Sequence, residues 1–173
     1  MNAAQLINQT SGKVEYYTPA AIVDAARRTM GGIDLDPASS PAANATVQAG
    51  RIFTAADDGL AHAWFGRVWM NHPFGRTTNR PWVSKLVREY RAGRVEQACA
   101  ITFASTSEAW FQPLFRFPLA FLSPRTNYLL PNGQPLRGVT KGSVVVYLGP
   151  NVAEFGRQFG QFGHIVVPLE VAA

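Results

Sequence analysis

At 173 residues, the chain is long enough for one compact α/β domain and too short for two domains of ordinary size. Apolar residues make up 47% of it and charged residues 16%, a composition that excludes wholesale disorder. The net charge of +5 favours a polyanionic partner, although proteins that never meet nucleic acid also carry charges of this size.

Cysteine content and apolar runs restrict the compartment. Cys99 is the single cysteine, so a disulfide within the chain is excluded, as is usual in a reducing cytoplasm. No apolar run reaches the ~20 residues that span a bilayer, and the first residues lack the pattern of a signal peptide. We expect a soluble, intracellular protein without a metal site, because its three histidines are dispersed: His62, His72 and His164.

The chain begins with a polar, aperiodic stretch. We expect residues 1–14 to form a flexible arm ahead of a single domain over residues 15–173. Thr18 and Pro19 supply an N-cap and a proline at the first helical position, and apolar residues at helical spacing predict a helix that ends before Gly31.

Two strands and a helix are predicted in the middle of the chain. Residues 33–37 predict a short buried strand with a carboxylate at its end, and one helical turn is expected over residues 41–48. Residues 67–71 predict a second strand, and residues 81–91 predict an amphipathic helix. The basic side chains of this helix are expected to face outward: Lys85, Arg88 and Arg91.

The remaining apolar runs continue the alternation of strands and helices. They predict strands at 97–103, 119–123, 143–149 and 164–169, and helices at 107–115 and 154–162. This alternation predicts an α/β, Rossmann-like fold with a doubly wound, mostly parallel sheet and helices on both faces. Ligands of such sheets bind beyond the carboxyl ends of the strands, where three polar side chains fall: Asp34, Asp36 and Asn71.

The most specific motif directly follows the second of these strands. Asn71-His72-Pro73-Phe74 resembles the Asn/Asp-Pro-Pro-Tyr/Phe motif of amino-methyltransferases, with His72 in place of the first proline. Taken alone, the four residues also fit an ordinary turn after a strand. Adenine's amino nitrogen is a poor nucleophile because its lone pair is delocalised into the ring. Acceptors aimed at its two protons offset the positive charge that develops there.

Several further segments occur in the order typical of one family. The chain resembles the phage and prophage DNA adenine-N6-methyltransferases over roughly residues 15–168. The resemblance rests on the motif at Asn71 together with residues 15–19, 33–39, 53–60, 64–71, 104–111, Arg125 and 142–147. It implies a methyltransferase fold, S-adenosyl-L-methionine as cofactor, and N6-methylation of an adenine flipped out of double-stranded DNA.

The resemblance also implies roles for single residues. The catalytic residues are then Asn71, His72, Pro73 and Phe74. The Asn71 side-chain oxygen and the His72 carbonyl accept from the amine, and Phe74 stacks on the base, which contributes ~1–3 kcal/mol. The cofactor is expected to bind at Tyr17, Thr18, Pro19, Asp34, Asp36, Pro37, Asp58 and Asn71. The alternative interpretations are a helix cap at residues 17–19, a structural aspartate at Asp34 or Asp36, and an Asp-Gly turn at Asp58. The usual Gly-x-Gly turn is replaced by Ala38-Ser39-Ser40.

Basic residues cluster after the motif. Most helical faces of this kind are simply solvated, but we expect these residues to contact DNA phosphates around the flipped base. They are Arg76, Arg80, Lys85, Arg88, Arg91 and Arg94. Any sequence preference is expected to be short or relaxed and to come from the loops at 75–81 and 124–142. We expect a monomer or homodimer in the cytoplasm of a bacterial host.

Two other functions remain open from the sequence. Similar motifs occur in methyltransferases that act on RNA adenines or on protein glutamine amides. The histidine in the motif and the missing glycine turn also allow a catalytically inactive, methyltransferase-like DNA-binding protein.

Overall fold

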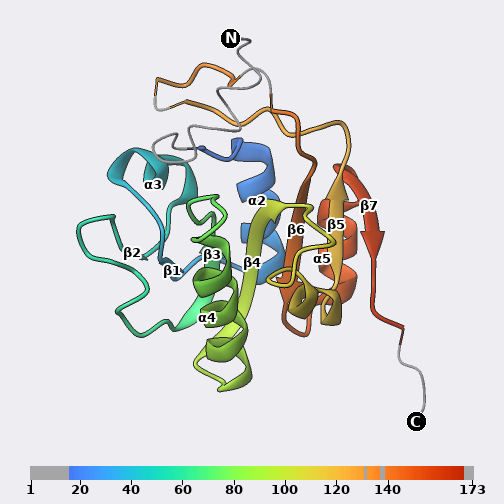
Figure 1. Ribbon diagram of the computed structural model, residues 1–173, viewed down its shortest axis with the longest axis horizontal. Coiled ribbons are helices and arrows are strands. Elements are labelled where there is room, and N and C mark those ends of the chain that lie inside the picture. Colours follow the sequence, from blue (N-terminus) through green and yellow to red (C-terminus); the bar gives the residue numbers. More distant parts are fainter. Residues whose placement is uncertain (1–15, 131, 137–138, 170–173) are drawn as a thin grey trace.

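A seven-stranded sheet organises the chain in a computed structural model that describes residues 16–130, 132–136 and 139–169. The predicted arm at residues 1–14 lies outside the described residues. The strands run in the order β2-β1-β3-β4-β6-β5-β7 (Figure 1). Their bounds are β1 Leu35–Asp36, β2 Arg51–Ile52, β3 Gly66–Met70, β4 Val95–Phe103, β5 Leu119–Leu122, β6 Ser143–Leu148 and β7 Gly163–Val166.

The sheet has a parallel half and a mixed half. β1 pairs in parallel with β2 and β3, and β3 pairs in parallel with β4. β6 then lies antiparallel between β4 and β5, and β7 runs antiparallel to β5 at the edge. The fold is therefore a single α/β domain with a mixed sheet, and its parallel half brings the carboxyl ends of β1, β3 and β4 to one edge.

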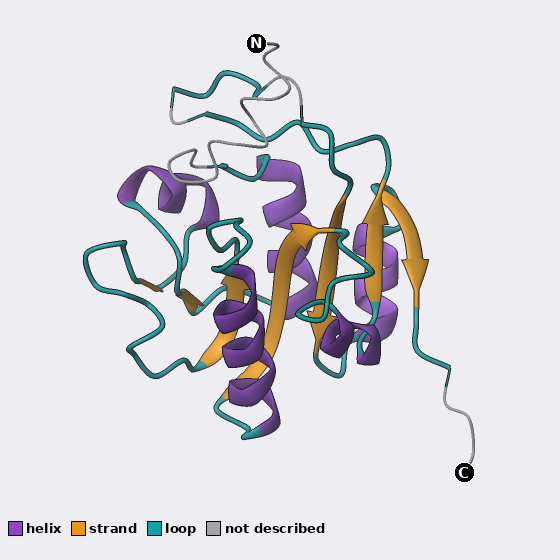
Figure 2. Ribbon diagram, viewed as in Figure 1, coloured by secondary structure: helices purple, strands orange, loops and turns teal. Residues whose placement is uncertain are grey.

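Helices pack on both faces of this sheet (Figures 1 and 2). Alternation along β4 explains why: Cys99 and Ile101 join the core under α2 and α5, whereas Ala98 and Ala100 join the core under α4. The helices are α2 Ala20–Met30, α3 Pro41–Val47, α4 Asn79–Arg91 and α5 Val152–Phe159. No helix among the described residues is both long and apolar enough to cross a membrane.

One predicted helix is wrong. Residues 107–111 form turns that lead into the short 3-10 helix η1, Gln112–Arg116. The backbone bonds here, from Phe111 to Glu108 and from Leu114 to Phe111, span three residues instead of four. Pro113 lacks the amide proton that an α-helix needs at that position, and its ring clashes with the preceding turn.

Two smaller differences concern side chains. Lys85 was expected to face solvent, but it is buried, because its ammonium pairs with Glu89 at 3.4 Å and lies 5.4 Å from the Trp64 ring. Thr18 was expected to cap α2, but Pro19 holds the cap position and no side chain caps the helix. The Thr18 hydroxyl is instead used in the pocket described next.

Candidate active site

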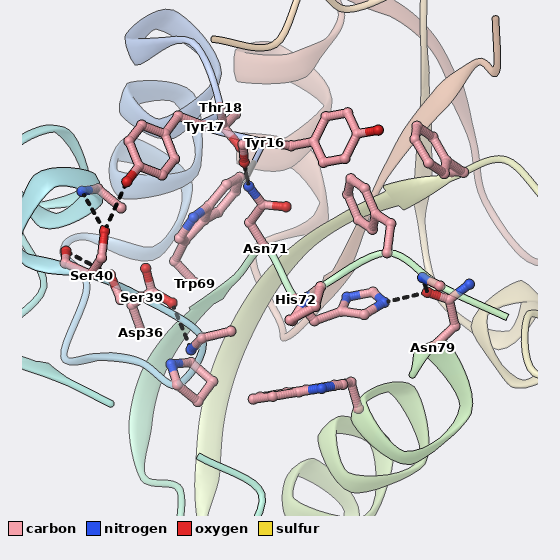
Figure 3. A pocket seen from close by; sticks show the side chains of 18 of the residues that line it. Tyr16, Tyr17, Thr18, Asp36, Ser39, Ser40, Trp69, Asn71, His72 and Asn79 are labelled. Carbon is pink, nitrogen blue, oxygen red and sulfur yellow. Dashed lines mark hydrogen bonds between the residues drawn. The ribbon is translucent and has the colours of Figure 1, made fainter. Parts of the chain in front are cut away.

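A cavity of about 1140 Å³ lies at the carboxyl ends of β1, β3 and β4. It gathers most of the sequence-predicted site residues from separate parts of the chain, as Figure 3 shows for the central ones. Those that line it are Tyr17, Thr18, Asp36, Pro37, Asp58, Asn71, His72, Pro73, Phe74 and Arg76.

Asn71 follows directly on β3, and its side chain is held in one orientation. Its amide nitrogen donates to the Tyr16 carbonyl at 2.5 Å and to the Thr18 hydroxyl at 3.1 Å. A carbonyl can only accept, so this contact fixes which end of the amide faces the segment before α2. The side-chain oxygen points away from that segment and accepts no hydrogen bond from any described residue (Figure 3). Asn71 therefore presents an oriented acceptor to the cavity.

Asp36, the last residue of β1, carries a buried carboxyl group that is 2% exposed. It accepts the Ala38 amide at 3.1 Å, and no described cation forms an ion pair with it. Burial raises the pKa of Asp36 to about 7, and the bonds from Ala38 and Ser39 only partly offset this shift. A cationic ligand group in the cavity would favour the charged form.

The segment that replaces a glycine turn, residues 38–40, has most of its groups engaged within the protein. The Ala38 amide bonds to Asp36 and the Ser39 amide to the Phe53 carbonyl. The Ser40 hydroxyl accepts the Ala43 amide at the start of α3 and lies 3.1 Å from the Tyr17 hydroxyl. The carboxyl group of Asp36 is thus a stronger candidate ligand-binding feature than the amides of this segment.

Asp58 and Gly59 form a tight turn that closes the cavity beside Pro37. Asp58 has a positive φ of 53° and accepts the Leu60 amide at 3.2 Å. A Cβ atom on Gly59 would lie 1.9 Å from the Pro37 carbonyl oxygen, so only glycine permits this approach. The indole nitrogen of buried Trp64 donates to the Gly59 carbonyl at 2.8 Å. These contacts hold Asp58 at the cavity.

His72 is 1% exposed, and burial lowers its pKa to about 4. Its ring lies 5.4 Å, edge to face, from Phe74 and 6.4 Å from Trp82. The neutral imidazole is therefore part of the packing below the motif. Its carbonyl, not its ring, is the group that sequence reasoning assigned to substrate.

An aromatic cluster forms the wall beyond Phe74. The Phe74 ring lies 4.5 Å from Phe103, 5.6 Å from Tyr16 and 5.9 Å from Tyr128. Tyr128 is fully buried and its hydroxyl lies 2.9 Å from the Ser143 hydroxyl, which fixes the back of the cluster. The ammonium of Lys141 sits 5.6 Å from the Phe103 ring and lines the cavity.

Asp34 and Pro19, two predicted cofactor residues, do not line the cavity. Asp34 directly precedes β1 and lies beside the start of β3, at the opposite end of β3 from Asn71, and both of its carboxylate oxygens accept from the Arg67 guanidinium at 2.8 Å. The hydrogen bond from Arg67 holds the pKa of Asp34 below its usual range. Asp34 is a structural partner of Arg67 and lies outside the candidate site.

Of the predicted DNA contacts, Arg76 alone lines the cavity. Lys85, Arg88 and Arg94 all lie against Glu89, whose carboxylate they neutralise at distances of 3.4, 3.4 and 2.5 Å. The hydrogen bond from Arg94 lowers the pKa of Glu89 most, and Lys85 and Arg88 lower it further. Arg80 and Arg91 are exposed on α4. The single negative charge of Glu89 offsets one of these three positive charges, and the side chains of Arg88 and Arg94 are 64% and 51% exposed.

Several cavity residues were not predicted individually, although three of them fall in the loops 75–81 and 124–142 that were expected to contact DNA. Lys141 and Leu129 belong to a long connection without periodicity, Trp69 was assigned only to a strand, and Asn79 lay outside the predicted helix: all four line the cavity. The fixed position of Asn79 could have been inferred from its place at a helix start. The other three depend on tertiary packing.

A family model described as DNA N-6-adenine-methyltransferase (Dam) matches residues 8–117, well over half of the chain. The match includes β1, β3 and the motif at Asn71. No curated protein and no solved structure gives a significant match.

Proposed function

This chain belongs to the DNA N-6-adenine-methyltransferase (Dam) family, and from that premise we propose that its cavity binds S-adenosyl-L-methionine and a flipped DNA adenine together. Pockets for one small ligand measure roughly 300–1,000 Å³. The cavity, at about 1140 Å³, lies close to the upper end of that range, so it has room for a second ligand beside the first.

The chemistry of the lining fits the cofactor. Buried Asp36, without a cationic partner among the described residues, suits the ammonium of the methionine moiety. Asp58, across the Pro37 contact, suits the amino group of the cofactor's adenine. Tyr17, Thr18 and Pro37 complete the proposed cofactor side. Bound S-adenosyl-L-methionine would supply an electrophilic methyl group on a sulfonium, which leaves as the neutral thioether.

The oriented amide of Asn71 carries the proposal. With its nitrogen occupied by Tyr16 and Thr18, its oxygen is available to accept one proton of the adenine amine, and the His72 carbonyl accepts the other. These acceptors draw the lone pair out of conjugation and offset the charge that develops as the nitrogen–methyl bond forms. The amine is neutral beforehand, so its surplus proton leaves to water after transfer. Phe74 stacks on the base.

We further propose that the fold is the Rossmann-like arrangement of methyltransferases. The parallel run β2-β1-β3-β4, helices on both faces and a cavity at the strand ends support it. The antiparallel β6 inserted between β4 and β5 departs from a simple doubly wound sheet.

DNA contact is proposed at the mouth of the cavity instead of along α4. Arg76 and Lys141, both exposed, line the cavity from the loops before α4 and before β6. A flipped nucleotide brings its flanking phosphates to that mouth, where two cations can grip them. Phosphate contacts of this kind carry no sequence information, which supports a short or relaxed recognition context.

Transfer of tritiated methyl groups to unmethylated double-stranded DNA tests the proposal, followed by nucleoside analysis. The account predicts label in N6-methyladenine. Label in N4-methylcytosine, or labelling of RNA or protein in preference to DNA, would reject it. Binding of the cofactor without transfer to any substrate would indicate the inactive relative.

A further inference from the structure

Polar contacts hold the turn between β3 and α4 in place. The Thr78 hydroxyl donates to the Pro73 carbonyl at 2.7 Å, and the Asn79 amide donates to the Gly75 carbonyl at 3.1 Å. The side chain of Asn79, only 8% exposed, reaches back into the turn and accepts the Gly75 amide at 3.2 Å. The Nε2 atom of His72 forms a hydrogen bond with the same Asn79 oxygen at 3.1 Å.

We propose that the His72 side chain is a positioning residue, which acts through Asn79 to hold the His72 carbonyl, one of the two proposed amine acceptors. This inference rests on the proposed function, because it assigns a role in the same reaction. The proposed function uses the His72 backbone carbonyl, whereas this inference concerns the His72 imidazole. Figure 3 shows the His72 ring turned toward Asn79 and away from Asn71.

The protonation state of the ring follows from its partner. The Gly75 amide can only donate, so the Asn79 atom that it reaches is the side-chain oxygen. An amide oxygen accepts, so His72 must carry its proton on Nε2. Nδ1 is then a bare lone pair, buried and without a partner among the described residues. A ring with its proton engaged and its lone pair buried cannot serve as the general base.

The contact ties the catalytic turn to a rigid element. α4 is fixed because Trp82, Val83 and Leu86 are buried against the sheet. Asn79 is the first residue of α4, so its bond to His72 transmits that rigidity to the residue whose carbonyl faces the amine. Loss of the bond would let the turn shift, and a misplacement near 1 Å can cost on the order of 100-fold in rate.

Substitutions at both partners test this brace, the hydrogen bond between His72 and Asn79. His72→Phe keeps a ring between Phe74 and Trp82 but removes the donor, whereas His72→Gln keeps a donor close to the Nε2 position. We expect His72→Phe and Asn79→Leu each to lower kcat about 10- to 100-fold, with KM for DNA and cofactor affinity within about threefold. His72→Gln should recover much of the loss, and the double variant His72→Phe/Asn79→Leu should be no slower than either single one.

Nitrogen-15 NMR of the histidine side chains provides a readout that needs no turnover. The expected spectrum has a neutral His72 with a slowly exchanging proton on Nε2 at pH 6–8, and that protection is lost in folded Asn79→Leu. A proton on Nδ1, a charged ring, or His72→Phe as fast as wild type would overturn the inference. If wild type methylates no adenine while the NMR result holds, the proposed function fails and the brace alone stands as a structural contact.

Discussion

At the scale of single residues, Asp36 and Asn71 face the same cavity from neighbouring strands in opposite electrostatic situations. Asn71 is neutral and has its donor satisfied, so its oxygen remains an acceptor over the whole working range of pH. Asp36 is ionisable and desolvated, with a pKa near 7. Cofactor binding at Asp36 should therefore depend on pH, whereas the acceptor role proposed for Asn71 should not.

We predict that affinity for S-adenosyl-L-methionine rises with pH up to about 7, as Asp36 becomes a carboxylate. Without ligand, Asp36 is half protonated near pH 7. A bound ammonium favours the carboxylate and lowers that pKa, so below pH 7 the affinity should fall by up to about tenfold per pH unit. Calorimetric titrations between pH 5.5 and 8.5 measure this slope.

Asp36→Asn is the matched control, because it keeps the shape and removes the titration. Its affinity should be weak and independent of pH in that range. His72, with a pKa near 4, stays neutral throughout. A wild-type slope that persists in Asp36→Asn would assign the titration to another group and remove Asp36 from the cofactor site.

Residue roles were predicted from the sequence where the backbone alone decides the position. Asp36 is the last residue of β1 and Asn71 directly follows β3, so the topology brings them together, as expected. Asp34 sits only two residues earlier, yet β1 has just two residues and Asp34 falls at its other end. The positions of the Lys85 and Lys141 side chains depend on tertiary contacts that no local sequence pattern encodes. The catalytic and cofactor roles themselves stay predictions.

At the scale of elements, the turn at Asp58 and Gly59 depends on close contact with the end of β1. We predict that Gly59→Ala destabilises the fold by about 1–3 kcal/mol, because a Cβ atom cannot occupy space 1.9 Å from the Pro37 oxygen. The same shift moves Asp58, so cofactor affinity should fall with it. Thermal melting with and without S-adenosyl-L-methionine measures both effects.

Gly156→Ala is the control at this scale. Gly156 lies inside α5, and a Cβ there would meet no atom within 4 Å. Alanine in a helix interior should stabilise by roughly 0.5–1 kcal/mol and leave cofactor binding unchanged. A Gly59→Ala protein that melts like wild type and binds the cofactor normally would refute the packing argument.

Periodic elements were predicted well, and irregular ones were not. The helices α2, α4 and α5 and the strands β3 to β7 lie within a few residues of their predicted bounds. β2 has only two residues and no apolar run, so its pattern is too short to recognise. The helix expected at 107–115 does not form, because Pro113 lacks the amide proton that an α-helix needs there, and the short 3-10 helix η1 takes its place.

At the scale of the whole molecule, the net charge of +5 does not itself identify the DNA surface. Glu89 pairs with Lys85, Arg88 and Arg94 but offsets only one of their charges, and the cavity mouth holds Arg76 and Lys141. The sheet order was not predictable from local patterns, because the antiparallel placement of β6 depends on pairing between distant segments.

We predict that Arg76→Ala and Lys141→Ala each weaken DNA binding and reduce the slope of log affinity against log salt by about one unit. Arg88→Ala should change the slope little, because its guanidinium pairs with Glu89. Arg157→Ala on α5 serves as a distant control of equal charge. Fluorescence anisotropy with a labelled duplex at several salt concentrations measures the slopes. A larger effect from Arg88→Ala than from Lys141→Ala would return the DNA surface to α4.

The most direct measurement is the single-turnover rate of methyl transfer to adenine in DNA, at saturating cofactor, for wild type and Asn71→Ala. The oriented oxygen of Asn71 acts only on the reacting amine, so its loss should slow transfer about 100- to 1,000-fold, while cofactor affinity changes little. An Asn71→Ala protein that keeps more than about a tenth of the wild-type rate would contradict the proposed catalytic role of Asn71.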